Sequence, residues 1–210
     1  MLLKRGALIA IEGIDGAGKS TLIAHLAQIF QDLPLVITKE PGGTAIGKKI
    51  RSLLLERESP LCNKTEFLLY AADRAHHFDQ VIIPALQAGK LVISDRLADS
   101  SLVYQGDGRR LDKTYINTIN RWAMDSISPD RTIFIRITPE IAYQRWQTRK
   151  GQITIFEQQQ ADFYQRLVAG FDQLYADRTD VIILDGMLAA DVIAKRAAQA
   201  LMDFIAQELS

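Results

Sequence analysis

Hydrophobic residues gather in five short runs along the chain, and segments with helical spacing separate them. The runs are rich in Ile, Val and Leu and cover Leu8–Ile11, Leu35–Thr38, Leu91–Ser94, Thr132–Ile137 and Val181–Leu184. Strands that alternate with helical segments predict a parallel sheet, because parallel strands need long crossovers and buried faces. The pattern therefore predicts an α/β fold, in which a five-stranded parallel sheet carries helices on both faces.

Polar or glycine-rich residues follow each predicted strand, at Gly13–Gly18, Glu40–Gly43, Asp95–Arg96, Arg149–Gly151 and Asp185–Gly186. Open parallel sheets bind ligands beyond the carboxyl ends of their strands, so we expect the binding site where these segments converge. Pro84 falls inside a helical segment, where we expect it to bend a helix or to begin a new one. No repeat, low-complexity tract or linker interrupts the pattern, which predicts a single domain over residues 1–210.

Composition and charge narrow the class of protein. Of 210 residues, 48% are hydrophobic, which is enough for one well-packed domain. Lys and Arg number 25, as do Asp and Glu, so no overall charge draws the chain to nucleic acid or to a membrane surface. No apolar stretch approaches the roughly 18 residues that a membrane span needs. Cys62 is the only cysteine and cannot form an internal disulfide, which favours a reducing, cytoplasmic location.

The segment Gly13-Ile14-Asp15-Gly16-Ala17-Gly18-Lys19-Ser20 matches the phosphate-binding loop G-x-x-x-x-G-K-[ST] at every position. It lies between a predicted strand and an amphipathic helix. Glycines let the backbone turn its N–H groups toward phosphate oxygens, and Lys19 adds a full positive charge at the start of the helix. Ser20 supplies a hydroxyl for Mg²⁺. The loop predicts a phosphate site and leaves open which phosphate chemistry it serves.

Two further polar stretches accompany the loop. Asp95 and Arg96 follow a predicted strand and should face the phosphate loop across the sheet. The acid suits the shell of a Mg²⁺ ion, and the Arg suits a transferring phosphoryl group, whose charge is spread over several oxygens. A surface ion pair is the alternative interpretation. The stretch Ser100–Gly106 places hydroxyls, a phenol and an amide close together, which suits the reading of a sugar and a base edge by hydrogen bonds.

With this spacing, the run Ile93–Arg96 and the following Ser100 and Tyr104-Gln105 together resemble the signature of the thymidylate kinase family. The resemblance extends over nearly the whole chain. Four other segments are similar to the family's opening loop, its second loop, the helix after that loop and the helix that carries the base: Glu12–Thr21, Thr38–Thr44, Ile50–Leu55 and Tyr70–Arg74. The resemblance implies a P-loop kinase fold with a short lid, and an enzyme that uses ATP and Mg²⁺ to phosphorylate dTMP to dTDP.

The resemblance also implies roles for individual residues toward dTMP. Arg51 and Arg96 would hold its phosphate. Tyr70 would stack under the thymine ring, Arg74 would reach a thymine carbonyl, and Tyr104 would crowd the 2′ position of the sugar. An Arg four residues after a Tyr projects from the same face of a helix, which agrees with the Tyr70 and Arg74 roles. The full predicted dTMP-binding set is Glu40, Arg51, Tyr70, Arg74, Arg96, Ser100, Ser101, Tyr104 and Gln105.

The remaining site predictions follow from the same resemblance. Asp15 would lie near the 3′-hydroxyl of dTMP. Residues Gly13, Ile14, Asp15, Gly16, Ala17, Gly18, Lys19, Ser20 and Thr21 form the predicted ATP-binding set, and Ser20 and Asp95 the predicted metal site. The predicted catalytic residues are Lys19, Asp15, Arg96 and Arg149. Family members suggest a homodimer formed by apolar helix faces, for which the stretch Phe67–Ile83 is the candidate, although its apolar residues could equally be core.

The lid departs from the family pattern. Relatives whose phosphate loop lacks an Arg, as this one does at Gly16, usually carry an Arg in a lid that reads Asp-Arg-[Ile/Phe]-Glu. This chain instead reads Thr154-Ile155-Phe156-Glu157. The transition-state charge would then be met by Arg145, Arg149 or Lys150, and we predict Arg149, in a lid segment at about 149–157.

Two alternatives stay open at this point. A kinase of the same family that acts on dUMP, CMP or UMP would carry the same loop, because Arg74 and Ser101 do not by themselves define a pocket for the thymine methyl group. The altered lid instead suits a nucleotide-binding protein with weak catalysis. A switch-type NTPase is disfavoured, because the guanine-reading motif Asn-Lys-x-Asp is absent.

Several residues carry no predicted chemistry. His25, His76 and His77 are expected on helix surfaces, and nothing near them has the spacing of metal ligands. Arg136 stands where relatives commonly carry an Asp, and the sequence offers no physical reason for that reversal of charge.

Overall fold

The structure, a computed structural model, describes residues 4–56, 59–148 and 161–209. Its centre is a five-stranded parallel sheet with the strand order β2-β3-β1-β4-β5. The predicted α/β fold class is therefore confirmed, and each predicted run forms a strand whose ends differ from the prediction by no more than one residue. The strands are β1 (Ala7–Glu12), β2 (Leu35–Lys39), β3 (Leu91–Asp95), β4 (Arg131–Arg136) and β5 (Val181–Asp185).

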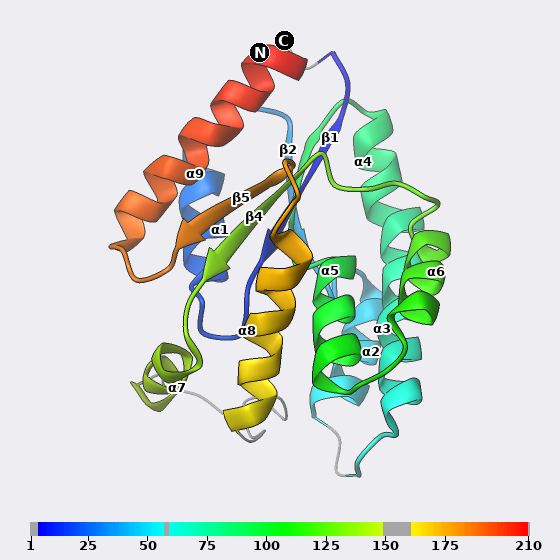
Figure 1. The fold of residues 1–210 in the computed structure, drawn as a ribbon. Helices are drawn as coiled ribbons and strands as arrows, with labels where there is room; N and C mark the ends of the chain where they lie inside the picture. The colour runs from blue at the N-terminus through cyan, green and yellow to red at the C-terminus, as the bar shows by residue number, and fades with distance from the viewer. Residues whose placement is uncertain (1–3, 57–58, 149–160, 210) are drawn as a thin grey trace.

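Helices cover both faces of the sheet (Figure 1). On one face, α1 (Lys19–Ile29) packs beside α9 (Ala190–Phe204). The other face carries most of the remaining elements, which are α2 (Ala45–Leu55), α3 (Asn63–His77), α4 (Ile83–Gln87), α5 (Ala98–Ser101), α6 (Lys113–Ala123) and α8 (Ala161–Tyr175). The helix α7 (Pro139–Thr148) lies below the end of β4, and three π-helical turns complete the fold: η1 (Phe78–Ile82), η2 (Leu102–Gly108) and η3 (Ile205–Leu209).

The alternation of side chains along β1 builds the core. Every residue of this central strand is buried. Its Ile9 and Ile11 belong to the large apolar cluster that includes α1 and α9, whereas Leu8 and Ala10 point to the cluster that includes η1 and α4. On β4, the ring of Phe134 lies 5.0 Å from that of Phe171, which fixes α8 against the sheet. The sheet is thus covered on both sides, as parallel sheets require.

Pro84 lies at the start of the helix α4, which is one of the two outcomes that the sequence predicts. It lies in the first turn of α4, immediately after the π-helical turn η1. A proline has no N–H to donate and its ring crowds the preceding turn, so a change of helical hydrogen bonding at this point avoids both penalties.

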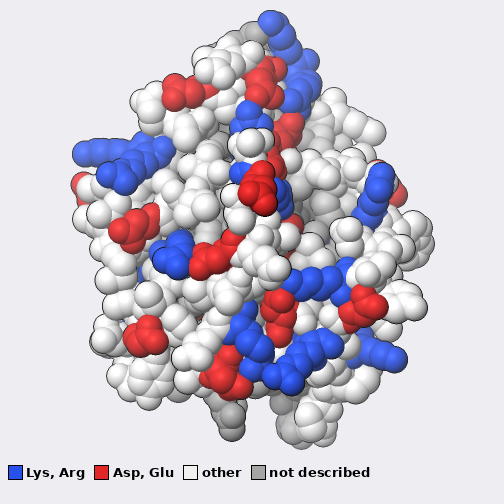
Figure 2. All heavy atoms as spheres, in the orientation of Figure 1, with Lys and Arg blue, Asp and Glu red and all other residues white. Residues whose placement is uncertain are grey.

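The surface carries charges of both signs. On the face drawn in Figure 2, Lys and Arg side chains are interspersed with Asp and Glu side chains. Among the described residues, no helix has the length and hydrophobicity that would let it cross a membrane.

Candidate active site

The phosphate loop joins the end of β1 to the start of α1, as its sequence predicts. Gly13, Gly16 and Gly18 have φ angles of 145°, 81° and 100°, which residues with side chains rarely adopt. Nζ of Lys19 donates to the carbonyl oxygens of Gly13 (2.9 Å) and Ile14 (3.0 Å), so the amine lies inside the loop. Burial lowers the pKa of Lys19 to about 8, and a phosphate group bound in the loop would favour its charged form.

A cavity of about 750 Å³ opens beside the loop. Its walls include the predicted ATP-binding residues Asp15 to Thr21 and the predicted metal ligand Asp95. Gly13 and Ile14 do not line it, and the side chain of Ile14 is buried in the core. Its lining also includes Thr148, Gly186, Leu188, Ala190 and Ile193. The loop therefore borders a space large enough for a nucleotide.

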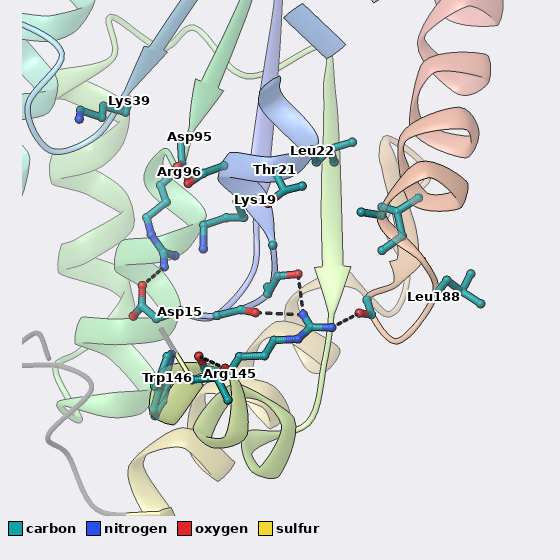
Figure 3. A pocket seen from close by; sticks show the side chains of 18 of the residues that line it. Asp15, Lys19, Thr21, Leu22, Lys39, Asp95, Arg96, Arg145, Trp146 and Leu188 are labelled. Atoms are coloured by element: carbon teal, nitrogen blue, oxygen red, sulfur yellow. Dashed lines mark hydrogen bonds and ion pairs between the residues drawn. The ribbon is translucent and has the colours of Figure 1, made fainter. Parts of the chain in front are cut away.

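Arg145 and Trp146 of α7 close the cavity beside the loop (Figure 3). Nη1 of Arg145 donates to the carbonyl oxygens of Gly16 (3.0 Å) and Ala17 (3.3 Å), and its Nη2 donates to that of Gly186 (2.7 Å). A Cβ atom at Gly16 would lie 2.9 Å from Nε1 of Trp146, so the indole touches the loop. Arg145 was one candidate for the catalytic charge, but here its guanidinium group ties the phosphate loop to the loop after β5.

Arg96 follows β3 and connects the two sides of the site. Its φ is 71°, in the left-handed region that favours glycine. Nη1 donates to the carbonyl oxygen of Gly13 (2.8 Å) and to Oγ of Ser100 (3.0 Å), while Nη2 donates to Oδ1 of Asp15 (2.7 Å) and to Oη of Tyr104 (3.1 Å). Figure 3 shows this ion pair with Asp15. Burial tends to raise the pKa of Asp15, but the charge of Arg96 contributes to an opposing effect that lowers it overall.

Glu12, the last residue of β1, supports the site although the sequence reasoning did not identify it. Its side chain is fully buried and accepts hydrogen bonds from the backbone N–H of Leu97 (2.8 Å) and from Oγ of Ser100 (2.6 Å). Burial raises the pKa of Glu12 to about 7. The carboxyl group fixes the turn on which Arg96 stands. The sequence signal that could have identified Glu12 is an acidic residue directly after the wholly apolar run 8–11.

A second cavity, of about 100 Å³, adjoins the first. All of the residues predicted to bind dTMP line it: Glu40, Arg51, Tyr70, Arg74, Arg96, Ser100, Ser101, Tyr104 and Gln105. The two cavities share Asp15, Glu40, Arg51 and Arg96. The structure therefore brings the predicted acceptor residues together and joins them to the phosphate loop at the two arginines that were predicted to hold a phosphate.

The polar groups of the second cavity are held by buried partners. Oη of Tyr104 donates to Oδ2 of Asp15 (3.0 Å), and Nε2 of Gln105 donates to Oε1 of Glu66 (3.2 Å). The hydroxyl of Ser100 already donates to Glu12, so it acts on Arg96 more than on a ligand. Such partners restrict the side chains to one orientation before a ligand binds.

The structure corrects one prediction, for His77, and explains one residue, Arg136, for which the sequence offered no reason. The prediction that His77 lies on the helix surface is wrong: its side chain is fully buried and contacts Thr38 and Glu40. The positive charge of Arg136 is explained by an ion pair, because its Nε and Nη2 donate to the two carboxylate oxygens of Asp172 on α8, each at 2.8 Å. The predicted lid residues Arg149 and Lys150 and the run 154–157 lie outside the described residues.

A phosphate loop joined to a second cavity, with arginines at the joint, is the arrangement expected of an enzyme that moves a phosphoryl group between two bound molecules. The fold and the site thus define a P-loop nucleotide kinase.

Comparison with known proteins narrows this class. The family model "Thymidylate kinase" matches residues 11–196. The thymidylate kinase of Carboxydothermus hydrogenoformans is 44% identical over 176 residues, which cover 83% of this chain and 86% of that protein. The thymidylate kinase of Nitrosomonas europaea is 36% identical over 209 residues, or 96% of this chain and 95% of that protein. The crystal structure of thymidylate kinase from Ehrlichia chaffeensis superposes with a TM-score of 0.74 at 28% identity, over 94% of this chain and 99% of that chain.

The chain therefore belongs to the thymidylate kinase family. It is a phosphotransferase that phosphorylates dTMP to dTDP, and the family implies ATP as the phosphoryl donor.

Proposed function

We propose that this chain transfers the γ-phosphoryl group of ATP directly to dTMP at the joint between the two cavities. The observation that supports this most strongly is that every residue predicted to bind dTMP lines one cavity, which meets the phosphate loop at Arg51 and Arg96. An oxygen of the dTMP phosphate forms a bond to the γ-phosphorus while the bond to the bridging oxygen breaks, and ADP leaves. The acceptor phosphate is already a nucleophile, so the protein contributes alignment, neutralisation of charge and exclusion of water.

The donor side consists of the phosphate loop and a metal site. Backbone N–H groups of the loop and Lys19 would hold the phosphates, and a bound Mg²⁺ ion would supply further positive charge against them. Ser20 and Asp95 would hold this ion. Oδ1 of Asp95 is buried and has no hydrogen-bond partner among the described residues, and a cation or its water shell would satisfy it. No group of three or more His, Cys, Asp or Glu residues in the described part of the chain could hold a metal, which agrees with an ion bound mainly through phosphates.

The acceptor side reads dTMP by charge, stacking and shape. Arg51 and Arg96 bind its phosphate; Nη1 of Arg51 is held by the carbonyl oxygen of Pro41 at 2.9 Å. Tyr70 offers its ring to the base, and Arg74 donates to a base carbonyl. Tyr104 lines the same cavity and would crowd a ribose 2′-hydroxyl, which would favour deoxyribose.

The lid supplies the remaining charge. Arg145 is committed to three carbonyl oxygens of the loops around the donor cavity, so it does not have a free guanidinium group for the transferring phosphoryl. We therefore keep Arg149 as the residue that meets the transition-state charge, in the manner of an arginine finger.

A coupled assay tests this function with ATP, Mg²⁺ and a panel of dTMP, dUMP, CMP and UMP. We expect dTMP to have the highest kcat/KM. Arg74→Ala should weaken dTMP by about 1–3 kcal/mol with little change in the KM of ATP, because a charged hydrogen bond is lost. The variant His76→Gln is a matched control, since this half-buried neighbour lies on the same helix and does not line either cavity.

The outcomes separate the alternatives. A higher kcat/KM for dUMP, CMP or UMP would make the chain a related pyrimidine nucleotide kinase. Tight binding of dTMP and ATP without dTDP formation would instead identify a nucleotide-binding protein that has lost catalysis. If Arg74→Ala changed only the KM of ATP and left that of dTMP unchanged, the acceptor site would have to lie elsewhere.

We also propose a homodimer in the cytoplasm. Within the stretch Phe67–Ile83, Phe67, Ala71, Phe78 and Ile82 belong to the core of the subunit, and Leu68 is the large apolar residue that stays exposed. Helix α3 packs between α2 and α6, and these neighbours expose Leu53, Tyr115 and Trp122. Such a group of apolar side chains suits a second copy of the chain. Light scattering should give a dimer mass for the wild type and a monomer mass for Leu68→Glu combined with Trp122→Glu; a monomeric wild type would refute the proposal.

A further inference from the structure

A chain of hydrogen-bonded polar side chains leads from the half-buried Thr38 to Glu40 and Arg74, which both line the acceptor cavity. It begins at Thr38 on β2, passes through His77 and Glu40, and ends at Arg74, which lines the cavity. The exposed fractions are 0% for His77, 4% for Glu40 and 1% for Arg74. Burying polar groups this deeply is costly unless they are hydrogen-bonded, so we expect these side chains to be positioned together.

The imidazole ring of His77 has one orientation. Nδ1 donates to Oε1 of Glu40 (3.0 Å), because a carboxylate can only accept, and the hydroxyl of Thr38 pairs with Nε2 at 2.6 Å. The ring also packs closely against Gly43, where a Cβ atom would lie 2.5 Å from Nε2. Both ring nitrogens are occupied, and the ring holds Glu40 in place.

Glu40 passes this constraint on to Arg74. Its second oxygen, Oε2, accepts from Nε of Arg74 at 2.8 Å. Nη1 of Arg74 donates to Oδ1 of Asn120 (2.6 Å) and to Oγ of Ser101 (3.2 Å). Nη2 makes no hydrogen bond to a described residue, so it is the nitrogen left for a ligand in the cavity. The plane of the guanidinium group is thus set by three partners, and Glu40 is the one that carries charge.

We infer that His77 is a positioning residue for base selection, which acts through Glu40 on Arg74 and thereby raises the preference for thymine over cytosine. Thymine presents a carbonyl oxygen where cytosine presents an amino group, so a well-aimed donor stabilises only thymine. This inference rests on the proposed role of Arg74. His77 itself does not line either cavity and acts only through its partners.

Two substitutions of His77 separate its two contacts. The side-chain amide of His77→Asn can replace Nδ1 and keep the bond to Glu40, whereas that of His77→Gln reaches the position of Nε2 and keeps the bond to Thr38. We expect His77→Gln to raise the KM of dTMP by on the order of tenfold, and that of dUMP in parallel, because both bases carry the same carbonyl. The inhibition constant of dCMP and the KM of ATP should stay within about twofold. His77→Asn should stay closer to the wild type.

The inference fails if His77→Asn is as impaired as His77→Gln, or if dTMP and dCMP weaken by the same factor, since a merely structural role would do both. Arg74→Ala in the same assay distinguishes this failure from a failure of the proposed function. Unchanged dTMP kinetics in Arg74→Ala would overturn the assignment of the cavity, whereas a loss in Arg74→Ala with none in His77→Gln overturns the inference alone. If the His77 variants do not fold, Glu40→Gln carries the test, and it should show the same selective loss of dTMP.

Discussion

Arg96 offers the sharpest test of the site, because its side chain and its backbone can be tested separately. Its guanidinium group makes four hydrogen bonds, to Gly13, Ser100, Asp15 and Tyr104. Removing a preorganised cationic donor of this kind commonly costs about 3–4 kcal/mol in the transition state. We therefore expect Arg96→Ala and Arg96→Gly to lower kcat/KM for dTMP by roughly 10²–10³-fold.

The backbone gives the two variants different stabilities. Arg96 has a φ of 71°, and a side chain in this region costs about 1–2 kcal/mol that glycine avoids. Glycine loses more entropy on folding, which offsets about 0.5–1 kcal/mol of that gain. Because both variants lack the same guanidinium group, that loss cancels when they are compared. Arg96→Gly should be the more stable variant by about 1 kcal/mol.

Urea unfolding supplies the stability difference, and steady-state kinetics supplies kcat/KM. If Arg96→Ala is at least as stable as Arg96→Gly, the turn after β3 is not strained at this residue. If either variant keeps kcat/KM within about threefold of the wild type, Arg96 does not act in phosphoryl transfer.

Three further predictions address Lys19 of the phosphate loop, the buried acid Glu12 and the lid. Lys19→Ala should lower kcat by on the order of 10²-fold in a folded protein. An unchanged kcat would contradict the assignment of the phosphate loop. Glu12 has a folded pKa raised from 4.5 to about 7, so its contribution to stability is present at low pH and is lost as the pH rises through 7. The free energy of unfolding of Glu12→Gln relative to the wild type should therefore increase from about pH 5 to about pH 8 in urea titrations, and a constant difference would contradict the buried acid. Arg149→Ala should reduce kcat far more than either KM, and the added substitution Ile155→Arg should partly restore kcat. If Arg149→Ala leaves kcat unchanged, Lys150 becomes the candidate for the lid charge.

The sheet could be predicted from the sequence because its inner strands β1, β3 and β4 are largely buried and read as continuous apolar runs, and the half-buried edge strands β2 and β5 are apolar as well. The same topology explains why the site could be predicted: parallel strands end at one edge, so the segments after β1, β2 and β3 had to meet there. Residues of all three segments do so, since the donor cavity is lined by Asp15 to Thr21, by Glu40 and by Asp95 and Arg96. Features that depend on the local pattern and on the topology of the sheet can therefore be predicted from the sequence.

His77 and Glu12 could not be predicted in this way. The buried face of α3 carries Asp73, Arg74 and His77, so hydrophobic periodicity gives the wrong face for these positions. Their burial depends on hydrogen bonds to partners such as Glu40, more than thirty residues away in the chain. Arg136 is the same case at the surface, since only the fold places Asp172 beside it. Partners distant in sequence, rather than local composition, decide such positions.

The two tryptophans of the chain lie in opposite surroundings, and this gives the protein a pair of built-in optical reporters. Trp122 on α6 is 78% exposed, whereas Trp146 is 8% exposed and touches the phosphate loop at Gly16. Indole emission shifts with the polarity around the ring, so Trp122 would follow the association of subunits while Trp146 would follow the filling of the donor cavity. Replacing either one by Phe leaves a single emitter, and the binding of ATP can then be timed in a stopped-flow instrument without any added label.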